Sequence, residues 1–354
     1  MGKNAQAANK NNRIMYLEYM RVISIFLVIF HHIGCQGFNQ PTLPDGHWMV
    51  YNVWLSSRWG IGTFVMISGI LFLGRDIDVK IIIKKYVLHI VTAFFVWKFI
   101  YAIYESWKVG DFGSNFLREF LNGPFHFWYM PMIAGVYLCI PIFRLIVKDE
   151  KVMKYYLILS VIFQFVFPQI KTLLVDFAPD GIAKLLVYGL TNDIGMMMMD
   201  VVFGYGFYFV FGYFMHNSVI SKKQEVWIYV LGLIGYFSTL ILRTLTDNAA
   251  YYDFFTVNIL LETIAAYTFI RLHICGFPRI PKLDDIVVHF SKWSFGAYLV
   301  HLLVISVECE YFNIFVGRAH PVISVPIIGL FTFLVSIGVS AILNQIPFVK
   351  KYLV

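Results

Sequence analysis

The first apolar stretch of the chain carries side chains that could do chemistry. Residues 15–35 are almost entirely hydrophobic, yet they include Glu18, Arg21, His31 and His32. A charged side chain in hydrocarbon costs roughly 2.5–3.5 kcal/mol on insertion scales, so such groups face a protein interior or a water-filled cavity. An imidazole in that setting is suited to general-base catalysis. The stretch therefore predicts a functional site.

The spacing of these side chains predicts which of them share one face of a helix. Arg21 and His32 are eleven positions apart, which is close to three turns at ~3.6 residues per turn and leaves ~20° of offset and ~16 Å along the axis. Glu18, three residues before Arg21, joins the same face. His31 points about 100° away. One face thus offers a charged pair and, three turns deeper, a titratable base.

The composition places this helix in a membrane. Hydrophobic residues make up 59% of the 354 residues and charged residues only 14%, with 35 phenylalanines, against roughly 45–50% and 25% in soluble domains. We therefore expect an all-α, polytopic integral membrane protein. Apolar segments recur without a polar insertion of domain size, which predicts one transmembrane domain over residues 15–345, between a tail at 1–14 and a tail at 346–354.

Charge and cysteine usage exclude other classes of function. The net charge of +7 could indicate nucleic-acid binding, but the cations gather at the ends of apolar segments, as they do in membrane proteins. We expect no nucleic-acid partner. The four cysteines, Cys35, Cys139, Cys275 and Cys309, form no CxxC, and no His or Cys shows metal-ligand spacing. Neither a disulfide framework nor a metal site is predicted.

The apolar segments predict about ten membrane spans and an orientation. With ~20 residues per crossing, the predicted spans are 15–35, 50–74, 86–104, 127–147, 152–172, 196–216, 226–244, 252–274, 286–307 and 322–345. Lysine and arginine between these spans gather on the side of the two termini. The positive-inside rule then predicts that both termini are cytoplasmic. No small-residue cleavage site follows the first span, so we expect it to be retained rather than removed as a signal peptide.

The second and third spans add cations at both membrane faces. Arg58 opens a Gly-rich segment, with Gly60, Gly62 and Gly69, that permits close approach of a helix or ligand. Arg58 is expected near the depth of His32. The cations that follow this span have two interpretations, a topology anchor or a cytoplasmic seat for phosphates. These cations are Arg75, Lys80, Lys84 and Lys85.

Two later segments could contribute to an acceptor site. Residues 124–131 place His126, Trp128 and Tyr129 between two prolines, either as an interfacial aromatic belt or as an acceptor-side or re-entrant segment. In the ninth span, polar side chains recur at helical spacing and should line a cavity. They are Ser294, Tyr298, His301 and Glu308.

The sequence resembles the membrane-bound acyltransferase 3 family of ten-helix, acyl-CoA-dependent O-acyltransferases. The spacing from Arg21 to His32 is similar to that family's first-helix signature, and residues 57–69 resemble its second-helix "FxxSG" segment. FWYMPMIAGVYLCIP (127–141) and SFGAYLVH (294–301) resemble its fourth-helix and late-helix motifs. The motifs follow in the family's order along nearly the whole chain. Gly62 stands where the family often has proline, and Lys84 and Lys85 lack the following proline of its basic motif.

The resemblance implies acyl transfer, most simply of acetyl, from cytoplasmic acyl-CoA to a hydroxyl of a surface glycan or lipid-linked acceptor outside a bacterial cytoplasmic membrane. His32 would be the general base, Arg58 would stabilise the oxyanion or orient the acceptor, and Glu18 would hold Arg21. The remaining expected contacts are to the CoA phosphates, from Arg21, Arg75, Lys84, Lys85 and Arg144, and to the acceptor, from His126, Trp128, Tyr129, Tyr298 and His301. For His301 the interpretations of cavity wall and second base both stay open.

Two other classes of function compete with this interpretation. Ten helices with buried polar stripes would also suit an export or flipping protein for a surface polysaccharide. Consumption of acyl-CoA distinguishes the enzyme from the exporter. A purely structural scaffold fits poorly with so many ionisable groups inside the membrane.

Overall fold

The computed structural model describes residues 13–38, 44, 46–179, 181–197, 199, 202–274 and 280–354, without the side chains of Phe38, Ala183, Val187 and Leu190. All regular structure in this described part is helical. The prediction of an all-α, polytopic membrane protein is confirmed. The expected tail at 1–14 lies mostly outside the described residues.

The helices follow one another with short connections. The α-helices are α1 Met15–Phe38, α2 His47–Leu55, α3 Gly60–Leu73, α4 Val79–Ile81, α5 Leu88–Val109, α6 Ser114–Asn122, α7 Tyr129–Leu138, α8 Ile140–Lys148, α9 Glu150–Ser160, α10 Phe167–Phe177, α11 Ile182–Gly195, α12 Gly206–Asn217, α13 Lys222–Thr246, α14 Val257–Leu272, α15 Pro281–Tyr311, α16 Pro321–Leu343 and α17 Pro347–Tyr352. Two π-helical turns, η1 Ile82–Val87 and η3 Val161–Val166, continue into α5 and α10. The 3₁₀ turns are η2 Phe125–Trp128, η5 Ala249–Tyr252 and η7 Val316–Arg318.

Within the described residues, eight helical segments are long and apolar enough to cross a membrane. A ninth is counted if α7 and α8, which meet at a bend of 55°, form one span. The expected sixth span, 196–216, appears as the 12-residue helix α12, because the described residues between Met196 and Tyr205 form turns. A 12-residue helix is only ~18 Å long, short of the ~30 Å hydrocarbon core.

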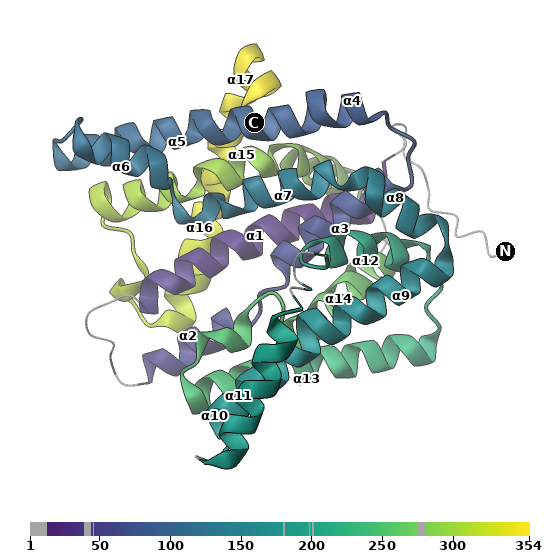
Figure 1. Cartoon of the computed structure of the whole chain (residues 1–354). Helices are drawn as coiled ribbons and strands as arrows, with labels where there is room; N and C mark the ends of the chain where they lie inside the picture. Colours follow the sequence, from purple (N-terminus) through teal and green to yellow (C-terminus); the bar gives the residue numbers. More distant parts are fainter. Residues whose placement is uncertain are drawn as a thin grey trace.

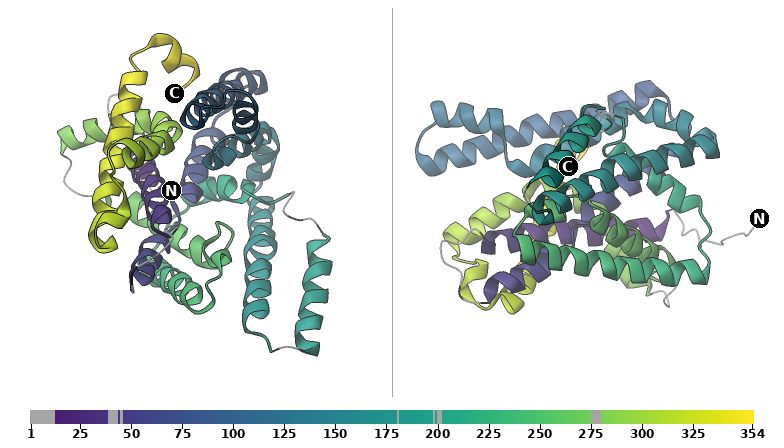
Figure 2. Two further views of the ribbon diagram at one scale, coloured as in Figure 1. Left: turned by 90° about the vertical axis from the view of Figure 1, so that its left-hand side faces the viewer. Right: turned by 60° about the horizontal axis from the view of Figure 1, so that its bottom comes forward.

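Helix α1 runs through the middle of the bundle, packed on α3, α15 and α16 (Figure 1). Helices α5 and α7 lie on one side of it and α12, α13 and α14 on the other (Figure 1). Helices α10 and α11 form a hairpin that projects from the bundle (Figure 2). The ionisable residues of α1 are therefore surrounded by other helices rather than by lipid.

Glycines allow α3 and α12 to touch through their backbones. A Cβ added at Gly69 would lie 1.8 Å from the carbonyl oxygen of Phe209, and one at Gly212 would lie 2.4 Å from that of Met66. Only glycine fits at such a crossing. The close approach expected from the Gly-rich second span is therefore observed at Gly69, and it anchors the short helix α12 inside the bundle.

Side chains also tie the ends of α12 and of the chain to the bundle. Arg271 of α14 donates hydrogen bonds to the carbonyl oxygens of Met215 and, at 2.9 Å, Ser218, which closes the C-terminal end of α12. The predicted C-terminal tail forms α17, and the Leu353 carbonyl accepts a hydrogen bond from Trp97 Nε1 at 3.0 Å. The cytoplasmic placement of both termini stays a prediction.

Candidate active site

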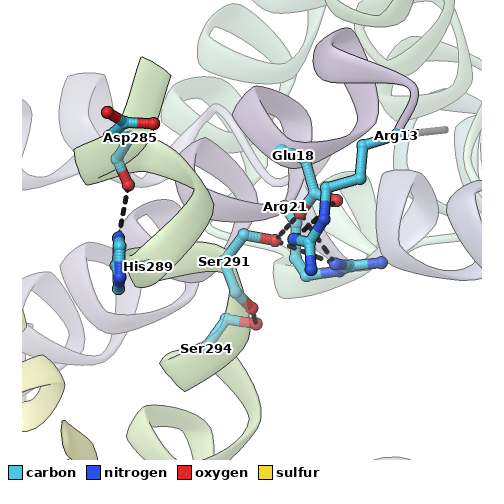
Figure 3. A network of polar contacts seen from close by, with 7 residues as sticks. All are labelled: Arg13, Glu18, Arg21, Asp285, His289, Ser291 and Ser294. Carbon is cyan, nitrogen blue, oxygen red and sulfur yellow. Dashed lines mark hydrogen bonds and ion pairs between the residues drawn. The ribbon is translucent and has the colours of Figure 1, made fainter. Parts of the chain in front are cut away.

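Glu18 and Arg21 meet as their spacing predicts. Arg21 Nη1 lies 3.2 Å from Glu18 Oε2 and donates a hydrogen bond to Ser291 Oγ of α15 at 2.8 Å, while the Ser291 hydroxyl donates to Glu18 (Figure 3). Arg13 Nη1 approaches the other carboxylate oxygen of Glu18 at 3.7 Å. The network fixes the Arg21 guanidinium between α1 and α15.

Arg21 contributes to a cavity, called here the inner cavity, with a volume of about 280 Å³. The cavity extends from Phe72 and Tyr86, beside the turn that follows α3, to Tyr298 in the middle of α15. Ser294 and Phe295 of α15 form another part of its wall. A mostly apolar cavity with a cation at its wall suits a flexible chain that carries an anionic group.

A second cavity, called here the outer cavity, has a volume of about 110 Å³ and contains the expected base. Its polar lining consists of His31, His32, Ser57, Arg58, His126, Tyr129 and Tyr298. Aromatic rings complete it, among them Phe125, Trp128 and Phe254. The structure thus gathers His32, Arg58 and the residues of the proline-bracketed segment around one space.

The two cavities adjoin each other. Val28, Ile61, Tyr129 and Tyr298 line both of them. Val28 lies two turns after Arg21 and one turn before His32. The helical face that carries Arg21 and His32 therefore passes from one cavity into the other.

His32 is half-buried, and its ring is surrounded by other rings. The ring centroids of Phe125 and His301 lie 5.2 and 5.1 Å from that of His32. Within the described part of the chain, no hydrogen bond holds the His32 ring. Its nitrogens are therefore available for hydrogen bonding in the outer cavity.

His301 and His126 form a buried extension of the imidazole cluster. Their ring centroids are 4.8 Å apart, and they are 0% and 2% exposed. His301 Nδ1 lies 2.6 Å from the Tyr298 carbonyl oxygen. His301 Nε2 and both ring nitrogens of His126 have no hydrogen-bond partner within the described part.

Arg58 is bracketed by aromatic rings. Its guanidinium carbon lies 4.8 Å from the ring centroid of Tyr252 and 4.4 Å from that of Phe254, and its Nη1 donates to the Tyr252 carbonyl oxygen at 3.2 Å. Among the described residues no carboxylate forms an ion pair with it. Its charge is therefore available to a substrate.

The expected phosphate-binding cations lie apart from this arrangement. Arg75, Lys84 and Lys85 are exposed and line neither cavity. Lys85 Nζ lies 5.4 Å from the ring centroid of Tyr86, which does line the inner cavity. Lys85 thus stands next to the inner cavity rather than within it.

Arg144 makes contacts of a structural kind. Its Nη1 and Nη2 donate to the carbonyl oxygens of Ile77 and Phe72, at 2.6 and 3.3 Å. It lines neither cavity. Its guanidinium closes the C-terminal end of α3 and holds the turn that leads to α4.

Other residues of the site carry no clear signal in the sequence. Ser291 joins the Glu18 and Arg21 network from one turn before the polar stripe of α15. His31 lines the outer cavity together with His32 despite its different helical phase. Arg243 Nε donates to Asn52 Oδ1 at 2.8 Å, and its guanidinium carbon lies 4.4 Å from the ring centroid of Tyr252. Only the three-dimensional structure connects Arg243 with the surroundings of Arg58.

The described cysteines and acids do not assemble into a further centre. Cys35, Cys139 and Cys309 are free thiols, and Cys275 lies outside the described residues. Within the described residues, no group of three or more His, Cys, Asp or Glu side chains could hold a metal ion.

Comparison with known proteins identifies the family. The acyltransferase 3 family model, described as an acyltransferase domain, matches residues 14–344. No curated protein and no solved structure matches the chain at a significant level. Because the family match covers nearly the whole chain, the protein belongs to the acyltransferase 3 family of membrane acyltransferases.

Proposed function

We propose that this protein transfers an acyl group, most simply acetyl, from acyl-CoA to a hydroxyl of a surface glycan or lipid-linked envelope acceptor. The observation that supports this best is the meeting of the two cavities at Tyr129 and Tyr298. Arg21 belongs to the inner cavity, and His32 and Arg58 belong to the outer cavity. Two substrates can therefore approach from opposite ends and react at the shared wall.

The inner cavity is the proposed donor site. The CoA phosphates bind near its mouth at the cations of residues 75–85, and the pantetheine arm extends along α1 past Arg21. Arg21 and His32 are separated by ~16 Å along the helix, a distance similar to the length of an extended pantetheine. The thioester then lies next to the outer cavity while the nucleotide remains at the cytoplasmic end.

The outer cavity is the proposed site of chemistry. His32 accepts the proton of the acceptor hydroxyl while that oxygen attacks the thioester carbonyl carbon. Negative charge develops on the carbonyl oxygen, and the unpaired Arg58 guanidinium stabilises it in a site lined by aromatic rings. The C–S bond then breaks, and the leaving CoA thiolate takes the proton from His32. The products are the acyl ester and free CoA.

The proposed location is the bacterial cytoplasmic membrane, with both termini inside. This orientation places the Arg21 end of α1 toward cytoplasmic acyl-CoA and the His32 end toward the envelope. The distribution of lysine and arginine between the spans supports it.

The test uses the purified full-length chain in lipid nanodiscs. Radiolabelled acetyl-CoA is mixed with de-O-acylated envelope glycans of the source organism, and label in the glycan and released free thiol are measured. We expect equal amounts of both from the native protein, and a loss of at least about 100-fold in His32→Ala. Transfer by His32→Ala at the native rate would refute the assignment of the base. Glycan transport without release of CoA would instead favour the export function.

A further inference from the structure

We propose that His301 is the positioning residue of the base: its Nε2 accepts a hydrogen bond from the His32 ring and holds the imidazolium that forms during acyl transfer. The inference rests on the proposed function, in which His32 is the general base. It assigns to a buried imidazole the task that a carboxylate performs in a Ser-His-Asp triad.

The surroundings of His301 fix which of its ring nitrogens carries the proton. Its Nδ1 lies 2.6 Å from the carbonyl oxygen of Tyr298. A carbonyl oxygen only accepts hydrogen bonds, so Nδ1 must carry the proton. In the neutral ring, Nε2 is then a lone-pair acceptor. The backbone of α15 thus fixes the tautomer without any acidic residue.

The Nε2 acceptor of His301 is buried close to the His32 ring. His301 is 0% exposed, and its Nε2 has no hydrogen-bond partner in the described part of the chain. A buried acceptor without a partner is costly, so its presence calls for an explanation. The His32 ring centroid lies 5.1 Å away with an interplanar angle of 31°. No hydrogen bond joins the two rings in the described part of the chain. The proposed bond therefore forms when the His32 ring turns toward Nε2 in the reacting complex, where catalytic hydrogen bonds commonly tighten.

Among the described residues, no carboxylate competes with His301 as a partner of the His32 ring. Within the described residues, neither cavity is lined by an aspartate or a glutamate. Glu18 is almost four turns away along α1 and is bound to Arg21 and Ser291. Glu308, seven residues after His301, accepts a hydrogen bond from Thr332 at 2.5 Å. Among the described residues, His301 is therefore the group that can orient the base.

This arrangement gives His301 a defined part in each half of the reaction. Before attack, its Nε2 accepts from one nitrogen of His32 and leaves the other nitrogen to accept the substrate proton. After attack, the same hydrogen bond stabilises the imidazolium beside Arg58 until the CoA thiolate takes the proton. His301 itself neither gains nor loses a proton.

Two substitutions separate this role from a structural one. His301→Gln places an amide oxygen near the position of Nε2 but loses the Nδ1 donor. His301→Asn keeps a donor for the Tyr298 carbonyl but loses the Nε2 acceptor. We expect kcat to fall about 100-fold in His301→Asn and His301→Ala, less than about tenfold in His301→Gln, with the KM for acetyl-CoA unchanged in all three.

His289 provides the matched control on the same helix. Its Nδ1 lies 2.7 Å from the carbonyl oxygen of Asp285 (Figure 3), but the ring is exposed. His289 precedes His301 by twelve residues of α15, or ~18 Å along the helix. His289→Gln and His289→Asn should both transfer acetyl at the native rate. The amount of folded protein is measured for every variant by size-exclusion chromatography before rates are compared.

The relative transfer rates of the His301 variants decide between the two roles. The proposal requires His301→Gln to be faster than His301→Asn, and any other order overturns it. His301→Ala added to His32→Ala should cause no further loss, because His301 acts through His32. If the native protein releases no CoA, the proposed function fails, whereas an active native protein with the wrong order of variants refutes only the role of His301.

Discussion

The Tyr298 hydroxyl donates a hydrogen bond of 2.5 Å to the backbone carbonyl oxygen of His126. This contact joins the middle of α15 to the η2 turn at the wall between the two cavities. It keeps the His126 ring against the ring of His301, with the centroids 4.8 Å apart.

Tyr298→Phe removes this contact while keeping the ring. We expect the free energy of unfolding to fall by about 1 kcal/mol and kcat to fall as well, because the η2 turn loses its tie to α15. Thermal unfolding in detergent and the radiolabelled transfer assay measure the two effects. Tyr129→Phe is the control, since Tyr129 lines the same wall and no described residue forms a hydrogen bond with its hydroxyl. A Tyr298→Phe protein that matches the control in both assays would show that the contact has no role.

Ser291→Ala should weaken acyl-CoA binding without slowing the chemical step. The Ser291 hydroxyl bridges Glu18 and Arg21, so its loss frees the Arg21 guanidinium to leave the wall of the inner cavity. We expect the KM for acetyl-CoA to rise by about threefold to tenfold and kcat to stay within a factor of two or so. Ser294→Ala is the comparison, because its hydroxyl donates to the Ser291 carbonyl oxygen at 2.8 Å rather than to the charged pair. A change in kcat alone would contradict a donor-side role for Arg21.

Arg144 and the lysine pair should behave differently. Arg144→Gln removes two hydrogen bonds to the carbonyl oxygens of Phe72 and Ile77, and we expect about 1–3 kcal/mol of lost stability with little change in the KM for acetyl-CoA. Lys84→Gln combined with Lys85→Gln should instead raise that KM at low salt and lose its effect at high salt, because exposed charges are screened.

Thermal unfolding and kinetics at two ionic strengths distinguish these variants. A raised KM for acetyl-CoA in Arg144→Gln at unchanged stability would support phosphate binding by Arg144, as expected from the sequence. A KM for the lysine variant that equals the native value at low salt would remove both lysines from that site.

Gly69→Ala tests the crossing of α3 and α12. The new Cβ would lie 1.8 Å from the Phe209 carbonyl oxygen, so the helices must separate, at a cost of about 1–3 kcal/mol. Gly135→Ala, in α7, is the control because nothing lies within 4 Å of its added Cβ. The midpoint of thermal unfolding should fall for Gly69→Ala only, and equal midpoints would mean that the helices do not depend on this contact.

The sequence predicts the features of the fold and the site that depend on local periodicity. Helical phase correctly pairs Glu18 with Arg21, and the apolar segments predict the long helices. It does not predict contacts between distant segments. Arg144 reaches carbonyl groups about 70 residues away in sequence, and nothing in its own neighbourhood distinguishes that role from phosphate binding.

Periodicity also misjudges two local features. It separates His31 from His32, but a cavity that is wider than one helical face includes both. Hydropathy joins residues 196–216 into one span, whereas turns up to Tyr205 shorten the helix to α12. Both differences arise because composition averages over a segment and does not record where its backbone turns.

The backbone contact between α3 and α12 makes the two helices a single mechanical unit. No side chain separates Gly69 from Phe209, so the two backbones are in direct contact at this crossing. Arg271 of α14 donates hydrogen bonds to carbonyl oxygens at the C-terminal end of α12. Ile61 of α3 lies at the wall shared by the two cavities. A displacement of α14 that moved the end of α12 would therefore also move Ile61 of α3, at the wall shared by the two cavities.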